Sequence, residues 1–430
     1  MKPLSGFRDL LPNDFARRHY IVTLWREAVR RYGFVEFDGP TLESAELYQK
    51  KNSGGEILTQ LYQFTDRGER VVALRPEMTP TLARMVAAHH REFPKPLRWF
   101  NVGNCFRYER QQRGRLREFL QLNCDLLGES SPAADAEMIA LLIDLLRSFG
   151  FDSQDFAIRL SDRLAWQEFL KSHGIPSERT TEFLSIIDKM EREPEEKTEE
   201  KLAVFDCSTL SLSVLKEFMT SAEVPVLTPL LEELSARGVR DYVQVDLSVV
   251  RGLAYYTGVV FEAFSLKGGL RALAGGGRYD RLIHDLSDGE VNLPAVGFGM
   301  GDAVLLEFIK ESSRALEQEK KSLVANAPCQ IYLVIADEVQ RCEAVVLAQQ
   351  LREAGWRVLF SLSAERVGKQ FSAAESAGAT FAVILGAEWP MLKIKRLSTR
   401  EENIILKEEL LKWLAQDILI TSPEAYLYEQ

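Results

Sequence analysis

Arginine is concentrated in one short stretch of the chain, residues 96–128, where the hydrophobic pattern predicts two β-strands joined by a loop. Guanidinium groups crowd this loop, beside a glycine at position 114: Arg110, Arg113, Arg115 and Arg117. Arginine suits planar, bidentate binding of phosphate or carboxylate groups. A solvated charged hairpin is the simpler interpretation, but so many arginines at one tip favour a binding site for an anion.

The second of these strands differs between its two faces, because successive side chains of a strand point to opposite sides. One face is apolar: Leu120, Leu122, Cys124 and Leu126. The other face is polar at three of its four positions: Phe119, Gln121, Asn123 and Asp125. The first strand carries three more side chains on one face: Cys105, Arg107 and Glu109. We therefore expect one patch of the sheet to be lined by Arg107, Glu109, Gln121 and Asp125.

Three further segments contain residue types that bind small molecules. In RPEMTP, residues 75–80, Glu77 precedes a predicted helix whose start is marked by a capping hydroxyl on Thr79 and by Pro80. The helix dipole is the ordinary explanation of an acid at this point. RGLAYYTG (251–258) pairs two tyrosines with an arginine, and the glycines of GGGRYD (275–280) let the backbone approach another group closely. A buried tyrosine pair and a surface loop are the ordinary interpretations of these two segments.

Taken together, these segments resemble a known family. FRYER and RGRLREFLQLNCDLLG resemble motif 2 of class II aminoacyl-tRNA synthetases, in particular the histidyl branch. RGLAYYTG and GGGRYD resemble the two histidine-binding signatures of histidyl-tRNA synthetases, and AVGFGMGDAVLLEFI (295–309) resembles motif 3. A predicted helix and short strand over residues 14–37 resemble motif 1, which forms the dimer interface in that family. The resemblance covers roughly residues 1–160 and 240–420.

The resemblance implies that histidine is activated with ATP and then transferred to the 3′ end of tRNA(His). It implies that Arg251 and Arg107 are catalytic, at the α-phosphate. The implied ATP-binding residues are Arg107, Glu109, Arg115 and Phe119, the last by stacking on adenine. The residues implied to enclose histidine are Glu77, Thr79, Gln121, Asp125, Tyr255, Tyr256 and Tyr279. Arg110 and Gln112 match the positions that contact the tRNA. Magnesium is expected with ATP, but no carboxylate pair in the sequence indicates its site.

Two residues depart from the family pattern, and the second departure bears on ATP. Ala254 stands where the family usually has aspartate. Motif 3 usually ends Gly-Leu-Glu-Arg, whereas this chain has Gly-Asp-Ala-Val over residues 301–304, so that Val304 replaces an arginine that contacts ATP. We expect Asp302 to pair with a neighbouring arginine or to meet a ribose or a metal ion.

A second function therefore stays open, that of a non-catalytic synthetase paralogue. Such a protein would act as the regulatory subunit of ATP phosphoribosyltransferase in histidine biosynthesis. Paralogues of this kind tend to lose the arginine at position 251 and much of the C-terminal domain, and this chain keeps both. A histidine-sensing or RNA-binding relative is a third interpretation.

The helices and strands that the sequence pattern predicts around these residues indicate an α+β protein. We expect a class II synthetase-type antiparallel sheet flanked by helices, with a helical insertion and a C-terminal α/β domain that resembles anticodon-binding domains. The predicted boundaries place the catalytic core at 1–161 and 226–312, the insertion at 162–225, a linker at 313–328 and the last domain at 329–430. In that domain apolar runs predict strands at 331–335, 358–360 and 381–385, with helices at 338–353 and 365–377 between them.

Composition excludes several other classes of protein. The chain has 430 residues, of which 46% are hydrophobic, and no segment is apolar for long enough to span a membrane. Its start lacks an apolar signal core, and its five cysteines are scattered without a CxxC pair, so we expect a cytoplasmic protein with reduced thiols. The five histidines lack metal-ligand spacing. A net charge of −10 argues against general coating of nucleic acid but allows a local basic patch. We expect a homodimer.

Overall fold

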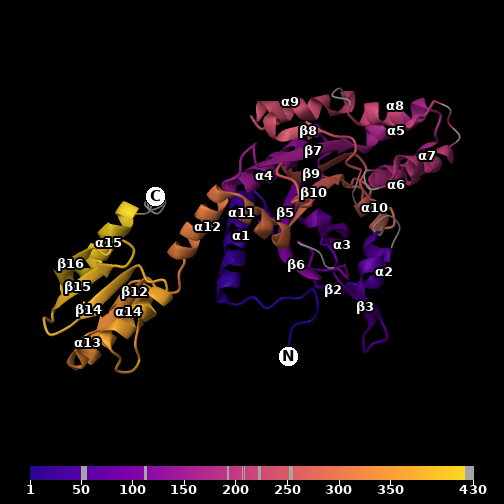
Figure 1. The fold of residues 1–430 in the computed structure, drawn as a ribbon. Coiled ribbons are helices and arrows are strands. Elements are labelled where there is room, and N and C mark those ends of the chain that lie inside the picture. The colour runs from indigo at the N-terminus through magenta and orange to yellow at the C-terminus, as the bar shows by residue number, and fades with distance from the viewer. Residues whose placement is uncertain are drawn as a thin grey trace. The chain divides into compact units, whose positions relative to one another are not determined.

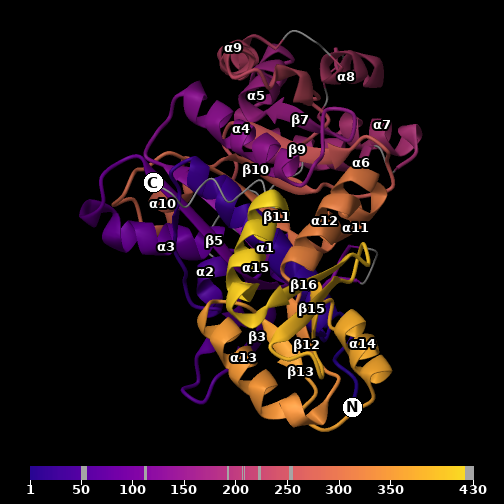
Figure 2. The ribbon, with the colours of Figure 1, turned by 90° about the vertical axis from the view of Figure 1, so that its left-hand side faces the viewer.

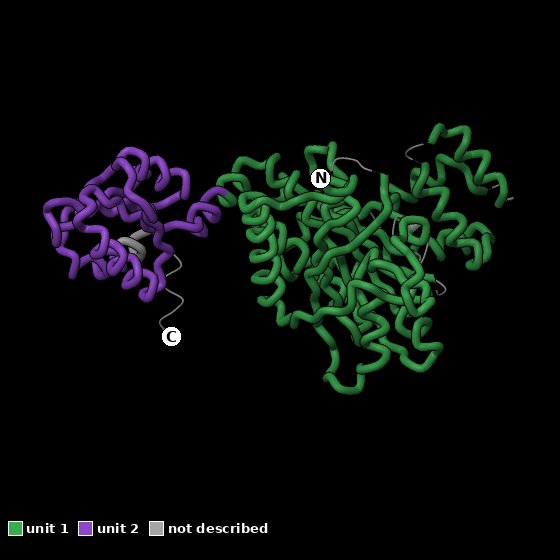
Figure 3. The backbone as a smooth tube through the Cα atoms, turned by 90° about the horizontal axis from the view of Figure 1, so that it is seen from below, with its two compact units in different colours: residues 1–319 green, residues 320–430 purple. Residues whose placement is uncertain are grey.

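The computed structural model describes residues 1–49, 56–110, 114–190, 193–205, 207, 209–220, 224–250 and 255–421. The chain divides into two compact units, residues 1–319 and 320–430 (Figure 3). Each unit has its own hydrophobic core; the first contains a large and a small sheet, and the second contains one sheet.

A large sheet forms the centre of the first unit (Figure 1). In the described part of the chain its strands follow the order β1 (Val35–Glu36), β5 (Leu97–Phe106), β6 (Glu118–Leu127), β11 (Ala295–Gly301), β10 (Ala274–Arg278), β9 (Val259–Ser265), β7 (Phe156–Asp162) and β8 (Val243–Val245). The pairs β1–β5 and β7–β8 at the two edges are parallel, and the pairs between them are antiparallel. The predicted antiparallel sheet is thus confirmed, with a parallel strand added at each edge.

Long helices cover one face of this sheet. α1 (Pro12–Arg31) and α4 (Pro132–Ser148) pack against each other, and α4 also packs on β6 and β11. Their apolar sides bury Trp25 and Leu142 against Phe100 and the apolar face of β6. Full burial of one large apolar side chain contributes about 1.5–3 kcal/mol, so this layer holds the sheet in place. α11 (Asp302–Glu311) follows β11 directly and packs on β6.

The opposite face carries the polar side chains and a smaller set of elements. α3 (Thr79–His89) packs against α10 (Leu282–Leu286), and a small sheet has the order β2 (Leu42–Ser44), β4 (Val71–Leu74), β3 (Tyr62–Thr65). α2 (Ala45–Gln49) and the 3₁₀ helices Glu56–Gln60 and His90–Glu92 complete this part. The predicted capping hydroxyl is wrong: Thr79 is the first helical residue, and Met78 is the N-cap and makes no side-chain capping bond. Pro80 lies in the first turn, as predicted.

Helices gather at one end of the first unit, between β7 and β8 in the chain (Figures 1 and 2). They are α5 (Arg163–Ser172), α6 (Thr180–Met190), α7 (Glu195–Ala203), α8 (Leu212–Met219) and α9 (Thr228–Ala236), with 3₁₀ helices Ser177–Arg179, Pro225–Leu227 and Arg240–Tyr242. The indole N–H of the buried Trp166 donates to the carbonyl of Leu247, 3.0 Å away, and so fastens α5 to the chain after β8. The helical pattern predicted for 162–225 is confirmed, while its status as an insertion stays a prediction.

The second unit contains the predicted βαβαβ pattern and an unpredicted addition. Its sheet has the order β13 (Val358–Phe360), β12 (Ile331–Ile335), β14 (Phe381–Leu385), β15 (Met391–Arg396), β16 (Glu402–Leu406). The first three are parallel and lie at the predicted residues, and β15 and β16 extend the sheet as an antiparallel hairpin. Helices α13 (Arg341–Glu353), α14 (Val367–Ser376) and α15 (Leu410–Thr421) accompany them, with 3₁₀ helices Glu338–Gln340 and Lys407–Glu409. The residues predicted as a linker are largely a helix, α12 (Ser313–Ala325).

Candidate active site

Two adjoining cavities lie over the polar face of the large sheet. The first has a volume of about 330 Å³ and the second a volume of about 590 Å³. Five polar side chains line both cavities: Arg107, Glu109, Arg115, Gln121 and Glu262. The cavities therefore form one site with two compartments, which can hold two joined or reacting ligands.

Alternate glycines of β11 make room for the polar side chains of β6. In the register of these strands Gly297 lies opposite Asp125, and Gly299 lies opposite Asn123, with Gln121 two residues further along β6. A Cβ atom at position 297 would lie 2.0 Å from Oδ1 of Asp125, and one at position 299 would lie 2.8 Å from Nε2 of Gln121. Both distances are far below van der Waals contact, so any other residue would displace these polar groups. The close backbone approach predicted for the glycine run also occurs, since a Cβ at Gly276 would lie 2.3 Å from the carbonyl oxygen of Gly297.

The first cavity contains two buried carboxylates, each held on one side by a tyrosine. The Tyr255 hydroxyl donates to Oε2 of Glu77 at 3.2 Å, and the Tyr279 hydroxyl donates to Oδ1 of Asp125 at 2.5 Å. The remaining oxygens, Oε1 of Glu77 and Oδ2 of Asp125, have no hydrogen-bond partner among the described residues. Nor has Nδ2 of Asn123, which lines the same cavity. Such groups are costly to bury unless a ligand satisfies them.

Burial raises the pKa of Glu77 and the pKa of Asp125 to about 7. Arg107 acts in the opposite direction on Glu77, as does its hydrogen bond from Tyr255, but neither offsets the loss of water. Loss of water raises the pKa further when a carboxylate has no cationic neighbour. A cationic or N–H-bearing ligand would restore the charged form, so this cavity is built for an organic ammonium or a similar donor.

Three tyrosines form the wall beside these carboxylates. The ring centroids of Tyr255 and Tyr256 are 5.3 Å apart, those of Tyr255 and Tyr279 are 5.8 Å apart, and both pairs are edge-to-face. Burial raises the pKa of all three hydroxyls well above the ordinary tyrosine value, so they stay neutral near pH 7. Thr79 and Gln121 also line the cavity. The wall thus offers aromatic surface together with neutral hydrogen-bonding groups.

The second cavity combines an aromatic ring with arginines. The Arg107 guanidinium carbon lies 5.4 Å from the centroid of the Phe119 ring, and Arg107 Nε donates to the carbonyl of Pro76 at 2.9 Å. Arg115 Nε lies 2.8 Å from a carboxylate oxygen of Glu109, which orients that guanidinium. An aromatic platform beside fixed cations suits a nucleotide, because the base can stack while the phosphates are neutralised.

The structure brings together the described residues that were predicted to bind histidine and ATP. The first cavity is lined by Glu77, Thr79, Gln121, Asp125, Tyr255, Tyr256 and Tyr279. Arg107, Glu109 and Arg115 line both cavities, and Phe119 lines the second. Arg110 is exposed and lines neither of them. Arg251, Gln112, Arg113 and Ala254 lie outside the described residues.

Sequence reasoning gave no role to several residues of the site, among them two charged residues and an asparagine. Asn123 stands on the predicted polar face but was given no role. Glu262 is the single charged residue of the apolar strand β9, a signal that was available in the sequence. Arg271 lines the second cavity from the connection between β9 and β10, where an arginine next to a glycine turn has the pattern of an ordinary surface residue.

Asp302 contacts an arginine, which was one of the expected alternatives. Its side chain is fully buried, and its Oδ2 atom forms an ion pair with Arg8 from the N-terminal segment. Its Oδ1 atom accepts a hydrogen bond from the backbone N–H of Leu120, 3.1 Å away. Asp302 therefore ties the N-terminal segment to the start of α11 and to β6.

This two-compartment site on an antiparallel sheet is the arrangement of the class II aminoacyl-tRNA synthetases, to which the sequence resemblance pointed. A family model described as histidyl-tRNA synthetase matches residues 6–302, and one described as an anticodon binding domain matches residues 330–417. The chain belongs to the histidyl-tRNA synthetase family.

Individual relatives agree with this assignment. The histidine–tRNA ligase of Opitutus terrae is 41% identical, over 95% of this chain and 96% of the relative. The chloroplastic/mitochondrial histidine–tRNA ligase of Arabidopsis thaliana is 38% identical, over 94% of this chain and 84% of the relative. The crystal structure of histidyl-tRNA synthetase from Nostoc has the same fold, with a TM-score of 0.78 and 23% identity over 97% of this chain and 99% of that chain.

Proposed function

We propose that this chain is a histidine–tRNA ligase, which activates L-histidine with ATP and transfers the histidyl group to the 3′ end of tRNA(His). The observation that carries the proposal is the pair of cavities that meet at Arg107. One cavity suits an amino acid with an ammonium group and a second N–H donor, and the other suits a nucleotide. The family membership supports the same activity.

In the first compartment, Glu77 and Thr79 would hold the α-ammonium group of histidine. Asp125, oriented by Tyr279, would accept the N–H of the imidazole. A neutral imidazole has one hydrogen-bond donor and one acceptor, which can pair with the buried polar groups of the cavity wall. A different amino acid would leave those groups unpaired, and this cost selects histidine. Gln121, Tyr255 and Tyr256 complete the enclosure.

In the reaction, a carboxylate oxygen of histidine attacks the α-phosphorus of ATP and diphosphate leaves. Both reactants are anions, so the protein contributes mainly by positioning them and by placing positive charge between them. Arg107 lines both compartments and is suited to contact the histidine carboxylate and the α-phosphate together. Phe119 would stack on the adenine, and Glu109 would orient Arg115 toward the nucleotide. The resemblance assigns Arg251 to the α-phosphate.

Magnesium would accompany ATP in this site. Mg²⁺ is commonly held by one or two carboxylates together with substrate phosphates. Glu262 and Glu109 are carboxylates that line both compartments, so the residues present fit such an ion. When bound, the ion would supply charge neutralisation at the phosphates.

In the second reaction a terminal hydroxyl of tRNA attacks the carbonyl carbon of the adenylate and AMP leaves. We assign Arg110, with Gln112, to the acceptor end of the tRNA, since Arg110 is exposed and lines neither cavity. The match of residues 330–417 to an anticodon binding domain supports a second contact with tRNA. Arg110→Ala should then weaken aminoacylation and spare histidine activation, and equal damage to both steps would contradict the assignment.

Two properties of the whole protein belong to this proposal. We assign it to the cytoplasm, because all five cysteines are free thiols, which suits a reducing compartment. Among the described residues, no helix is both long and apolar enough to cross a bilayer. We also propose a homodimer through the motif 1 region, around α1 and β1.

Histidine-dependent exchange between ATP and pyrophosphate tests the proposal. The wild-type chain should catalyse it. In single-turnover measurements Arg251→Ala should slow adenylate formation by about a hundred- to a thousandfold, the usual effect of removing one preorganised donor to a developing charge. A wild type that binds histidine but neither binds ATP nor catalyses exchange would overturn the proposal.

The regulatory-subunit alternative is not favoured. The crystal structure of an ATP phosphoribosyltransferase regulatory subunit/histidyl-tRNA synthetase from Bacillus halodurans has a TM-score of 0.69 with 24% identity, over 90% of this chain and 99% of that chain. This likeness shows the common fold alone. The curated relatives described above are ligases that match nearly the whole chain.

A further inference from the structure

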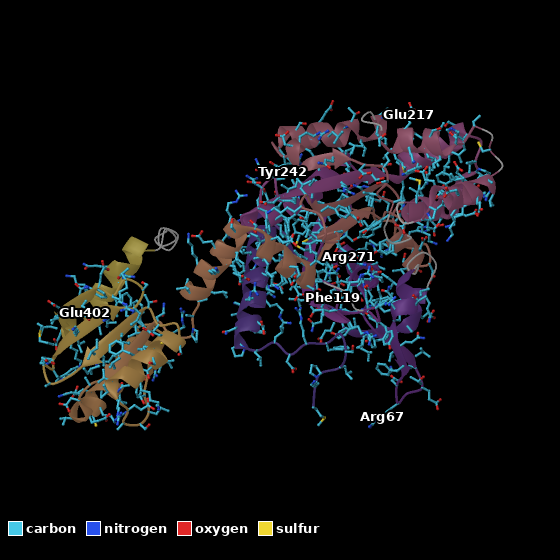
Figure 4. All side chains as sticks on the ribbon, viewed as in Figure 1. Arg67, Phe119, Glu217, Tyr242, Arg271 and Glu402 are labelled. Atoms are coloured by element: carbon cyan, nitrogen blue, oxygen red, sulfur yellow. The ribbon has the colours of Figure 1, made fainter. Side chains whose placement is uncertain are left out.

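Arg271 lies on the wall of the second cavity, on the connection between β9 and β10. It lines this cavity together with Phe119 and Val304 but does not line the first cavity. Figure 4 shows the labelled Arg271 and Phe119 in the same central region of the first unit. Arg271 is therefore placed at the nucleotide end of the site, away from the carboxylates of the amino-acid end.

The charge of the cavity lining depends on this residue. Among the described residues that line the second cavity, the charged ones are three arginines and two glutamates: Arg107, Arg115, Arg271, Glu109 and Glu262. Without Arg271 the lining would be formally neutral. A triphosphate carries several negative charges. In a cavity with a neutral lining it would lose contacts with water and gain no positive charge in exchange. Arg271 therefore gives the lining its net positive charge, to which a bound Mg²⁺ would add.

Position 304, on the other side of the cavity, carries no positive charge. Val304 packs directly under the backbone of Gly114, since a Cβ atom built at position 114 would lie 3.2 Å from Cγ2 of Val304. Gly114 has a φ of +73°, a left-handed conformation that favours glycine. Val304 therefore presents an apolar side chain both to Gly114 and to the cavity. The positive charge that the cavity lining offers the phosphates therefore comes from other elements.

The exposure of Arg271 indicates which phosphates it contacts. Arg107, which lines both cavities, is at the position for the α-phosphate, whereas Arg271 is solvent-exposed and lines only the nucleotide cavity. The β- and γ-phosphates leave the site together as diphosphate, so they must lie on a path to solvent. An arginine at the solvent side can bind them in the ground state and stabilise the charge that develops on them as they leave.

We propose that Arg271 binds the β- and γ-phosphates of ATP and supplies the cation that an apolar residue at position 304 cannot supply. The inference rests on the proposed ligase function, because it identifies a further residue for the same nucleotide. It assigns the connection between β9 and β10 to the triphosphate site.

Equilibrium binding of ATP and of AMP to purified variants tests this role, with histidine binding as a check on the fold. The Arg271→Ala variant should bind ATP about 10- to 100-fold more weakly than wild type, because it loses one charge-assisted contact. AMP affinity should stay within about twofold, since AMP lacks the two phosphates in question. Arg271→Lys should retain more ATP affinity than Arg271→Gln, because it keeps the charge. In pyrophosphate exchange the KM for ATP should rise in Arg271→Ala while the KM for histidine stays unchanged.

Lys267→Ala is the matched control. Lys267 is an exposed cation on the same connection, it lies outside both cavities, and its Nζ atom donates to the carbonyl of Glu311 at 3.0 Å. Its removal should leave ATP affinity unchanged. An unchanged ATP affinity in Arg271→Ala would overturn the inference, and so would an equal loss of ATP and AMP affinity, which would place Arg271 at the nucleoside. In both cases wild-type exchange would leave the ligase function standing; a wild type that neither binds ATP nor catalyses exchange would overturn both.

Discussion

Glu77 lowers the stability of the protein without histidine, and the same carboxylate is suited to bind histidine. Its carboxylate is fully buried, one oxygen has no partner among the described residues, and burial raises its pKa from 4.5 to about 7. A folded-state pKa above the unfolded value means that the folded protein holds the proton more tightly. Its stability therefore falls as the pH rises from about the unfolded pKa to about 7, and levels off above that. At 1.36 kcal/mol per pKa unit the shift corresponds to about 3 kcal/mol.

Glu77→Gln should remove this pH-dependent cost. The amide oxygen can still accept the bond from Tyr255, so the variant without histidine should gain stability relative to wild type as the pH is raised from 5.5 to 8, by about 2 kcal/mol. The KM for histidine should rise about 10- to 100-fold, because the ammonium group loses a charged partner. Urea unfolding at three pH values and exchange kinetics measure the two effects.

An exposed glutamate on α8 provides the control for this experiment. Glu217→Gln should show a stability difference from wild type that is small and does not vary with pH. If the stability difference between Glu77→Gln and wild type were also constant from pH 5.5 to 8, the carboxylate of Glu77 would not carry the raised pKa described here.

At the scale of elements, the N-terminal segment fastens the hairpin that carries the arginines. The carbonyl of Gly6 accepts a hydrogen bond from the backbone N–H of Arg117 at 2.9 Å, directly before β6. Two residues later Arg8 forms its ion pair with the buried Asp302 at the start of α11. One segment thereby joins the two elements that enclose the nucleotide cavity, β6 and the β11–α11 junction.

Removal of Arg8 should reduce the free energy of unfolding more than removal of the charge of Asp302. Arg8→Ala leaves a buried carboxylate without its cation and should cost about 3–5 kcal/mol, whereas Asp302→Asn leaves a half-buried arginine that water can reach and should cost about 1–2 kcal/mol. Burial raises the pKa of Asp302, so the cost of Arg8→Ala should shrink at low pH, where the folded protein takes up the proton. Urea unfolding of the two variants measures this difference.

The exposed pair of Arg26 and Glu36, with 2.6 Å between Nη2 and Oε1, serves as the control for that comparison. Arg26→Ala should cost less than about 1 kcal/mol, as exposed ion pairs do. Equal costs for Arg8→Ala and Asp302→Asn would contradict the view that the uncompensated buried charge dominates.

The sequence predicted those parts of the site that depend on local patterns. The alternation along β6 identified the side chains that line the cavity, because neighbours in a strand necessarily point to opposite faces. The partner of Asp302 could not be predicted, since Arg8 is 294 residues away and only the fold brings the two together. The cap at Thr79 was predicted wrongly because the local pattern is compatible with a helix start at either residue, and this threonine lines the cavity instead.

At the scale of the whole molecule, the pattern of apolar runs predicted the large sheet and the sheet of the second unit, but not all of their strands. β12, β13 and β14 are continuous apolar runs and were located at their observed residues. β15 and β16 contain charged residues on their exposed side, such as Lys393 and Glu402, whose oppositely charged ends lie 2.6 Å apart across the hairpin. Such a charged hairpin is hard to distinguish from a loop in the sequence, and the charged helix α12 was taken for a linker for the same reason.

The proposed homodimer is the last property to test at this scale. β1 is a short strand at the edge of the large sheet, and Val35 on it is 64% exposed, which leaves an apolar edge that a second copy can cover. Sedimentation at micromolar concentration should give about twice the 48.8 kDa of one chain. Val35→Asp should shift the protein toward a monomer, because it would bury a charge in the interface. Val204→Asp, at a similarly exposed valine of the same unit, should leave the mass unchanged. A wild-type monomer that still aminoacylates tRNA would show that the site is complete within one chain and that the motif 1 region is not an interface.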